Sequence, residues 1–214
     1  VKPLTEQIVK FSEWFGKHFG GGNATTGLIS LRDILAWVEF INSTYSKISN
    51  PESALLHGAA MVFIDALGTN NTSYLAENED RLRSQKLECV QMLSNLAGED
   101  LLKYFVQDFS VEISNGVLRS GLFELNRKEG SVSTPAFNLS APTTAANLMR
   151  VIRAMQVQKP ILLEGSPGVG KTSLISALAE CTGNKLTRIN LSEQTDLVDL
   201  FGSDAPGERT GEFV

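Results

Sequence analysis

Residues 165 to 172 have the sequence Gly-Ser-Pro-Gly-Val-Gly-Lys-Thr, a glycine-rich run that ends in an ammonium and a hydroxyl side chain. A phosphate group is bound by N–H donors that converge on it, and glycine permits the close approach and the unusual dihedral angles that this requires. In a G-x-x-x-x-G-K-T loop the lysine reaches the β- and γ-phosphates of a nucleotide, and the threonine hydroxyl ligates Mg²⁺. The pattern therefore predicts a site for ATP and Mg²⁺.

The position of each residue in this loop indicates its role. Lys171 is predicted to act in catalysis as a point charge on the phosphates, and Thr172 is the predicted metal ligand. The residues predicted to bind the nucleotide are Gly165, Ser166, Pro167, Gly168, Val169, Gly170, Lys171, Thr172 and Ser173.

The elements predicted around the loop agree with this function. Ile161-Leu162-Leu163 is a short apolar run of the kind that is buried in a parallel sheet. A helix is expected from about residue 170 to 181, where its first N–H groups would add to the anion site, and residues 186 to 191 form a second expected strand. Strand, loop, helix and strand in this order begin a doubly wound α/β domain. Without that context the glycines would indicate only a turn.

The first half of the chain has the spacing of helices. An amphipathic stretch begins the chain and runs into a glycine-rich loop at residues 20–23. Helices are expected over 31–46, from Pro51 to a stop near Gly68, and over 78–96. Residues 1–106 are therefore expected to form a small, all-helical unit.

The pattern changes at Phe109, where apolar and polar residues alternate on both sides of Asn115-Gly116. That dipeptide suits a type I′ turn, so a β-hairpin is expected, followed by a surface linker over residues 126–140. Residues 107–140 thus form a hairpin and linker, and residues 141–214 begin with a helix after Pro142 and continue into the phosphate loop.

Other residues with reactive side chains favour structural roles. His18 and His57 are isolated, which favours surface or packing roles. Glu193, Asp196 and Asp199 follow the second expected strand, and we interpret them as helix-capping acids in preference to a catalytic cluster. Cys89 and Cys181 lie in helical patterns and are expected to be free thiols in a reducing compartment.

The overall composition limits the class of protein. A net charge of −5 and a pI near 5.2 give no electrostatic reason for direct binding to nucleic acid. No apolar run approaches the roughly 18 residues that a membrane helix needs, so we expect a soluble intracellular protein without membrane contact.

Several segments of the second half resemble the midasin family of giant, dynein-related AAA+ ATPases of large ribosomal subunit assembly. The resemblance covers about a third of the chain and includes the flanks of the phosphate loop. It is carried by the following segments: Ala141–Thr144, Arg150–Gln156, Lys159–Thr172, Asn190–Leu197, Asp199–Gly202 and Gly211–Phe213.

The resemblance implies a fold and a function. Such proteins carry six AAA+ modules in one chain, so residues 1–106 would be the lid of one module and the following residues the start of the next. Arg32, at the head of a lid helix, resembles the sensor-2 arginine that reads the γ-phosphate of its own module, although it also fits an ordinary surface position. Partners would be neighbouring modules of the same chain, pre-60S ribosomal particles and their assembly factors, in the nucleus.

Alternative functions remain open at this point. The module could bind ATP without hydrolysing it and act as a structural brace, or the chain could be another AAA+ remodeller or a MoxR-like chaperone. In the family, the Walker B carboxylates, sensor 1 and arginine finger lie beyond the position of Val214, as do both strands that flank the phosphate-loop strand. We therefore expect a part of a longer polypeptide that hydrolyses ATP poorly by itself and has unpaired ladder groups at residues 161–164.

Overall fold

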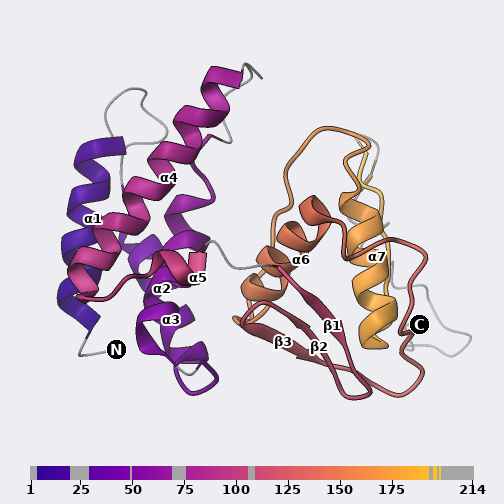
Figure 1. Cartoon of the computed structure of the whole chain (residues 1–214). Coiled ribbons are helices and arrows are strands. Elements are labelled where there is room, and N and C mark those ends of the chain that lie inside the picture. Colours follow the sequence, from indigo (N-terminus) through magenta and orange to yellow (C-terminus); the bar gives the residue numbers. More distant parts are fainter. Residues whose placement is uncertain are drawn as a thin grey trace, which may run out of the picture. The chain divides into compact units, whose positions relative to one another are not determined.

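The computed structural model describes residues 4–19, 29–48, 50–68, 76–105, 109–192, 195, 196 and 198 (Figure 1). Contacts divide the chain into two units, Val1–Asn184 and Lys185–Val214. The regular elements all lie in the first unit, and in chain order they are α1 (Thr5–Phe19), α2 (Leu31–Thr44), α3 (Pro51–Ala59), η2 (Ala60–Ile64), α4 (Ala76–Ala97), α5 (Leu102–Phe105), β1 (Val111–Ile113), β2 (Val117–Ser120), β3 (Phe123–Asn126), α6 (Pro142–Ala154) and α7 (Lys171–Thr182).

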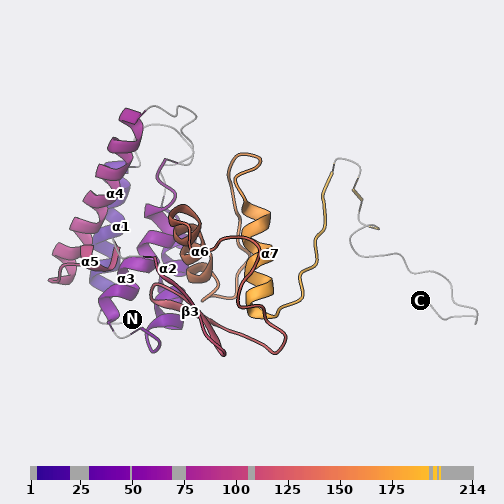
Figure 2. The same cartoon turned by 45° about the vertical axis from the view of Figure 1, so that its right-hand side comes forward.

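Helices α1 to α5 form the expected helical half, and their ends follow from local chemistry. The Ser30 hydroxyl accepts a hydrogen bond from the Asp33 N–H, and the Asp33 carboxylate accepts one from the Ser30 N–H, so a capping box begins α2. Asn50 caps α3 by accepting from the Glu52 N–H at 2.8 Å. Both Figure 1 and Figure 2 show α1 beside α4, which packs against it.

The helix that begins at Pro51 contains a feature that its sequence pattern does not reveal. After Ala59 the hydrogen bonds widen into the π-helical turn η2, which closes with the Asp65 N–H donating to the Ala60 carbonyl at 2.9 Å. Such turns occur as single inserts in α-helices, frequently at functional sites. The chain then leaves the helix at Gly68, whose φ of 85° agrees with the expected stop.

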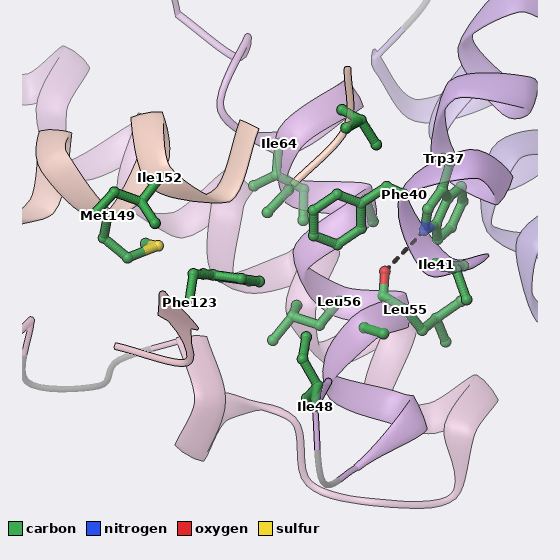
Figure 3. Packing of buried hydrophobic residues seen from close by; sticks show 14 of the residues in the cluster. Trp37, Phe40, Ile41, Ile48, Leu55, Leu56, Ile64, Phe123, Met149 and Ile152 are labelled. Atoms are coloured by element: carbon green, nitrogen blue, oxygen red, sulfur yellow. Dashed lines mark hydrogen bonds between the residues drawn. The ribbon is translucent and has the colours of Figure 1, made fainter. Parts of the chain in front are cut away.

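The core of this half is centred on Trp37 of α2, which is fully buried. Its indole N–H donates to the Leu55 carbonyl of α3 at 2.9 Å, so the polar atom of the largest side chain is satisfied (Figure 3). Phe11 of α1 and Phe63 of η2 meet the indole edge-on, with ring centroids 5.5 and 5.6 Å away. Three elements thus share one aromatic cluster.

The predicted hairpin is confirmed and gains a third strand. The sheet has the order β1-β2-β3 with antiparallel pairing, in which Ile113 lies opposite Leu118 and Ser120 opposite Phe123. The predicted type I′ turn is wrong, because that turn requires positive φ at both central residues and neither Asn115 nor Gly116 has it. The tighter reversal is at Gly121, where φ is 58°.

The predicted parallel strands are not found in the described part of the chain. Residues 160–170 contain no strand, and Leu162 is 86% exposed; residues 183–192 contain none either. A parallel strand needs neighbours that take up its N–H and C=O groups, and none of the described residues pairs with these segments. The sheet that the structure describes is the small antiparallel one.

Helices α6 and α7, which lie on either side of the phosphate loop in the sequence, pack against this sheet. Leu148 and Ile152 of α6 are fully buried, and Gly121 lies close to Met149. The predicted linker of residues 126–140 is largely exposed and fastens the end of α7, since the Lys128 N–H donates to the Thr182 carbonyl at 3.0 Å. Figure 1 shows α6 and α7 beside the sheet.

The sheet also contacts the helical half through one aromatic side chain. Phe123 of β3 meets the ring of His57 edge-on at 5.0 Å and that of Phe40 at 6.0 Å. Figure 3 shows Phe123 between the residues of α6 and those of α2 and α3. The contacts join the whole stretch up to Asn184 into one unit and show no boundary at residue 106. The predicted division of the chain at that residue therefore remains a prediction.

No helix among the described residues is long and apolar enough to cross a membrane.

Candidate functional site

The loop before α7 has the backbone that its glycines were predicted to permit. The φ angles of Gly165, Gly168 and Gly170 are 153°, 81° and 86°, a region that residues with a Cβ atom rarely adopt. Residues 164–169 are exposed, so a ligand can reach the N–H groups of this loop, to which only Pro167 contributes none. Three glycines with positive φ over six residues form the kind of concavity in which backbone amides bind anions.

Lys171 brings the ammonium group to the loop itself. Its Nζ donates to the carbonyl of Gly165 at 2.7 Å and to that of Ser166 at 2.9 Å. The side chain therefore folds back over the backbone bend, with its charge on the side of the glycines. This is the position from which an ammonium can reach a phosphate chain bound in the loop.

The first turn of α7 contributes a second set of donors. Its N-cap is Gly170, which offers no side chain as an acceptor, so the first N–H groups of the helix keep their capacity to bind an anion. Thr172 and Ser173 are exposed in this turn, which leaves both hydroxyls accessible. The loop and the helix N-terminus together can hold a polyphosphate and a metal ion that neutralises it.

A hollow lies beside this turn, lined on one side by the linker and on the other by α7. Phe137 forms part of the linker side, and its ring also approaches Gly170 so closely that a Cβ added there would lie 3.3 Å from Cζ. The lining residues are Ala136, Phe137, Thr172, Ser173, Ser176, Ala177 and Glu180. An aromatic ring and small side chains next to a phosphate loop fit a flat, apolar group attached to the phosphates.

The predicted nucleotide residues from Gly165 to Ser173 are therefore contiguous in space as well as in sequence. Arg32 is not brought to them by any contact within the described residues, where its side chain makes no hydrogen bond or ion pair and is exposed. Its predicted sensor role concerns the nucleotide of its own module, so it stays a prediction.

The other candidates take structural positions. The Asp196 carboxylate accepts from the Val198 N–H at 2.9 Å, as a capping residue does. Glu193 and Asp199 lie outside the described residues. His18 is exposed and stacks with Trp14, while His57 is buried, and both cysteines are buried free thiols. No group of three or more His, Cys, Asp or Glu side chains gathers within metal-binding reach in the described part.

Phe137 and Asp65 were missed by the sequence analysis. Phe137 is the only aromatic residue between residues 124 and 140, and an isolated aromatic in a polar linker indicates that the linker packs on something. Asp65 had no such signal, because its partners in α6 are far away in the sequence and the π-helical turn that presents it has no pattern of its own.

Comparisons with known protein families match two segments of the chain. The family model of the "Midasin AAA+ ATPase lid domain" matches residues 1–65, and that of the "ATPase family associated with various cellular activities (AAA)" matches residues 161–205. The second match includes the phosphate loop and α7. The chain is thus similar to a lid domain at its beginning and to an AAA ATPase at its end.

Two curated relatives are similar over most of this chain. Midasin of Dictyostelium discoideum is 39% identical over 204 residues, an alignment that covers 87% of this chain and 3% of that protein. Midasin of Giardia intestinalis is 37% identical over 208 residues, which cover 87% of this chain and 4% of that protein. The chain spans only this small share of its relatives, and one alignment runs through both the lid and the AAA segment. It therefore belongs to the midasin family of AAA+ ATPases, as a segment that contains a match to the lid domain and a match to the AAA family.

Proposed function

We propose that the loop from Gly165 to Thr172 binds the phosphates of ATP together with Mg²⁺, with Lys171 on the β- and γ-phosphates and Thr172 as a ligand of the metal. The observation that carries this proposal is the bend of three positive-φ glycines under the Lys171 ammonium, placed directly before a helix whose N-cap has no side-chain acceptor. When bound, Mg²⁺ would neutralise charge on the phosphates. The match to the AAA family over residues 161–205 supports the same assignment.

The hollow beside Phe137 extends this proposal to the rest of the nucleotide. Thr172 and Ser173 border both the phosphate loop and the hollow, so a ligand with its phosphates in the loop has its nucleoside on the side of Ala136 and Phe137. The Phe137 ring is a suitable partner for the face of a base. The linker of residues 126–140 then belongs to the binding site as well as to the fold.

In the full-length protein this segment would serve an ATPase that remodels pre-60S ribosomal particles by releasing assembly factors in the nucleus. The family of the chain supports this role, since it follows from the resemblance described for residues 141–214. The Ile161–Leu163 segment would then pair as a parallel strand with neighbours from the rest of the large subdomain. The partners would be the adjoining modules and the pre-60S particle.

The nucleotide site is tested by thermal unfolding of the chain with and without ATP and Mg²⁺. A ligand at about 100 times its Kd stabilises the folded state by roughly 2.7 kcal/mol, and Lys171→Ala should remove most of that shift. Lys185→Ala is the matched control, because Lys185 is an exposed lysine outside the loop. If Lys171→Ala keeps the full ATP shift, the assignment of the loop is wrong.

The same substitution separates hydrolysis from a structural role of this site in the full-length protein. A loss of ATP turnover in proportion to the loss of bound nucleotide would support a hydrolysing module. Unchanged turnover with an empty Lys171 site would support a module that binds ATP as a structural brace between its neighbours. A MoxR-like or other chaperone function would be favoured if pre-60S particles matured normally in cells that carry Lys171→Ala.

Arg32 is proposed as the sensor for the nucleotide of the module that owns this lid. Arg32→Ala should slow turnover by that module and leave the affinity of the Lys171 site for ATP unchanged. Arg32 is exposed in the first turn of α2 and has no partner among the described side chains, so its guanidinium is available to bind an anion. No effect on turnover would assign Arg32 to an ordinary surface role.

A further inference from the structure

Asp65, Arg150 and Arg153 form a charged contact between the helical half and α6, away from the phosphate loop. Oδ2 of Asp65 pairs with Nη2 of Arg153, and Oδ1 of Asp65 lies 3.7 Å from Nε of Arg150. Asp65 is the last residue matched by the lid model, whereas α6 leads into the AAA segment. The contact therefore links the end of the lid match to the helix that precedes the AAA match, across 88 positions of sequence.

The two arginines differ in burial although they lie one turn apart on α6. The side chain of Arg153 is 4% exposed and that of Arg150 is 46% exposed. A buried guanidinium loses its water, and among the described side chains Asp65 alone compensates Arg153, whose Nε has no hydrogen-bond partner. A buried ion pair of this kind contributes little net stability, because desolvation offsets the attraction between the charges. Stability alone does not account for the presence of this pair.

The remaining contacts at this junction do not define an orientation. Phe123 packs against the rings of Phe40 and His57. The hydrophobic effect that favours this contact is not directional, so the contact does not fix the angle between the helical half and the sheet. The ring nitrogens of His57 and the Ser120 hydroxyl are buried without a hydrogen-bond partner. The pairs Lys159–Glu39 and Lys47–Gln156 are at the exposed edge, where such contacts are weak. Among the described residues, Asp65–Arg153 is the buried ionic contact with a defined geometry.

The π-helical turn determines where this carboxylate lies. The bond from the Asp65 N–H to the Ala60 carbonyl spans five residues in place of four. Each residue of an α-helix advances by about 100°, so the extra residue turns Asp65 by about that angle relative to an uninterrupted helix. The local geometry of η2 therefore sets the direction in which Asp65 meets α6.

We propose that Asp65 and Arg153 are a positioning pair, which holds the lid in one orientation against α6 and the sheet and so sets the direction in which the lid joins the next module. The pair touches neither the phosphate loop nor the hollow beside Phe137. This inference goes beyond nucleotide binding and does not depend on it.

Spin labels on the full 214-residue chain measure this orientation directly. One label is attached at Lys10→Cys in α1 and one at Glu129→Cys in the linker, both exposed positions. The native thiols do not interfere, because Cys89 and Cys181 are buried and burial raises the pKa of Cys89 to about 12. The distribution of distances between the labels reports how narrowly the lid is held.

Asp65→Asn leaves the Arg153 guanidinium buried without its charge partner, and we expect it to lower the melting temperature by on the order of 10 °C. Arg153→Gln should cost less, because Asp65 is partly exposed and keeps Arg150 at 3.7 Å. The double variant Asp65→Leu/Arg153→Met replaces the pair with apolar groups of similar size. It should melt near the wild-type temperature and show a distance distribution that is roughly twofold broader or displaced. It tests the proposal even if the single variants do not fold.

Arg150→Gln is the matched control, since it removes the same charge from the same helix but leaves the buried pair in place. It should keep the wild-type distribution. The proposal is overturned if the folded double variant keeps the wild-type distribution, which would make the pair a mere packing contact. It is equally overturned if Arg150→Gln broadens the distribution as much as the double variant does, because general charge on α6 would then explain the effect.

Discussion

His57 illustrates how the interior changes the chemistry of one residue. It lies in α3 with both ring nitrogens buried and unpartnered, and its ring meets Phe123 edge-on. Burial, reinforced by the positive charge of Arg153, lowers the pKa of His57 from 6.5 to about 3. The ring is therefore neutral at pH 7 and acts as a packing group, in agreement with the role predicted from its isolation in the sequence.

This pKa predicts a dependence of stability on pH. The unfolded chain takes up a proton at His57 below about pH 6.5, while the folded chain does so only near pH 3, so acid favours unfolding throughout that interval. Above pH 6.5 the His57 ring is neutral in both states, and the free energy of unfolding has its full value. As the pH falls from 6.5 towards 3, the free energy of unfolding decreases by up to about 1.4 kcal/mol per pH unit. Denaturant unfolding of wild type and His57→Phe from pH 7 to pH 4 measures it.

The variant should have a shallower slope, and at pH 7 it should be as stable as wild type or more so, since it removes two unpaired polar atoms. His18→Phe is the control, because His18 is exposed on α1. An identical pH slope in wild type and His57→Phe would show that His57 does not carry the effect.

At the scale of elements, the contact between α2 and α3 depends on the absence of a side chain. A Cβ atom added to Gly58 would lie 2.3 Å from Cδ1 and 2.7 Å from Nε1 of Trp37. The indole there donates to the Leu55 carbonyl, so moving it also breaks a buried hydrogen bond. Gly58 is therefore required for close packing and not for an unusual dihedral angle.

Gly58→Ala should destabilise the chain by about 1–3 kcal/mol, because the indole has to leave its place in a densely packed core. The matched control is Gly16→Ala in α1, where the new Cβ would lie 3.6 Å from Ile29 Cδ1, an ordinary contact. Alanine is the better helix former, so the control should gain roughly 0.5–1 kcal/mol. Thermal unfolding compares the two, and a Gly58→Ala protein as stable as wild type would contradict the packing described for Trp37.

The elements that the sequence predicted well are those with local signals at their ends. The helix termini predicted at residues 31, 51 and 96 agree with the structure within two residues. Ser30, Asn50 and Gly98 flank these termini, and capping chemistry is decided by such near neighbours. The strand at Ile161 was predicted from apolar residues alone, but a strand also needs partners, and the described residues provide none. The π-helical turn before Asp65 was not predictable for the same reason, because it depends on distant contacts.

The candidate site divides in the same way. The glycines, Lys171 and Thr172 form a contiguous motif, and the structure shows positive φ at its glycines and the Lys171 ammonium bonded to the loop, while its role toward a nucleotide stays a prediction. The hollow beside Phe137 is formed by segments about 35 residues apart in sequence. Over such a separation, residue spacing does not predict which side chains come into contact. Arg32 lies further still from the loop, and only its resemblance to a family position indicated it.

At the scale of the whole molecule, residues up to Asn184 form one compact unit in which a helical half and a sheet share a core. Phe123 is 2% exposed and contributes the aromatic contacts between them. A domain with a shared core unfolds cooperatively when neither part can keep its buried surface without the other. The helical half and the sheet with its helices are therefore expected to unfold together.

Phe123→Ala should remove about 3–5 kcal/mol of stability and weaken both parts equally. Tryptophan fluorescence reports the helical half, because Trp14 and Trp37 both lie there. Hydrogen exchange at the amides of β2 reports the sheet. In wild type the two measurements should give one common denaturant midpoint, and two well separated midpoints would show that the halves fold independently.

The ammonium of Lys171 already has partners before any nucleotide arrives, since two peptide oxygens of its own bend hold it. Under the proposed function, uptake of a polyphosphate would be an exchange, in which the incoming oxygens must outcompete those carbonyls for the same protons. The net gain is the difference between two sets of bonds, so a short anion that reaches the amides but not the lysine should bind far more weakly than a triphosphate. The proposed role of Lys171 would thereby make the site selective for the length of the phosphate chain.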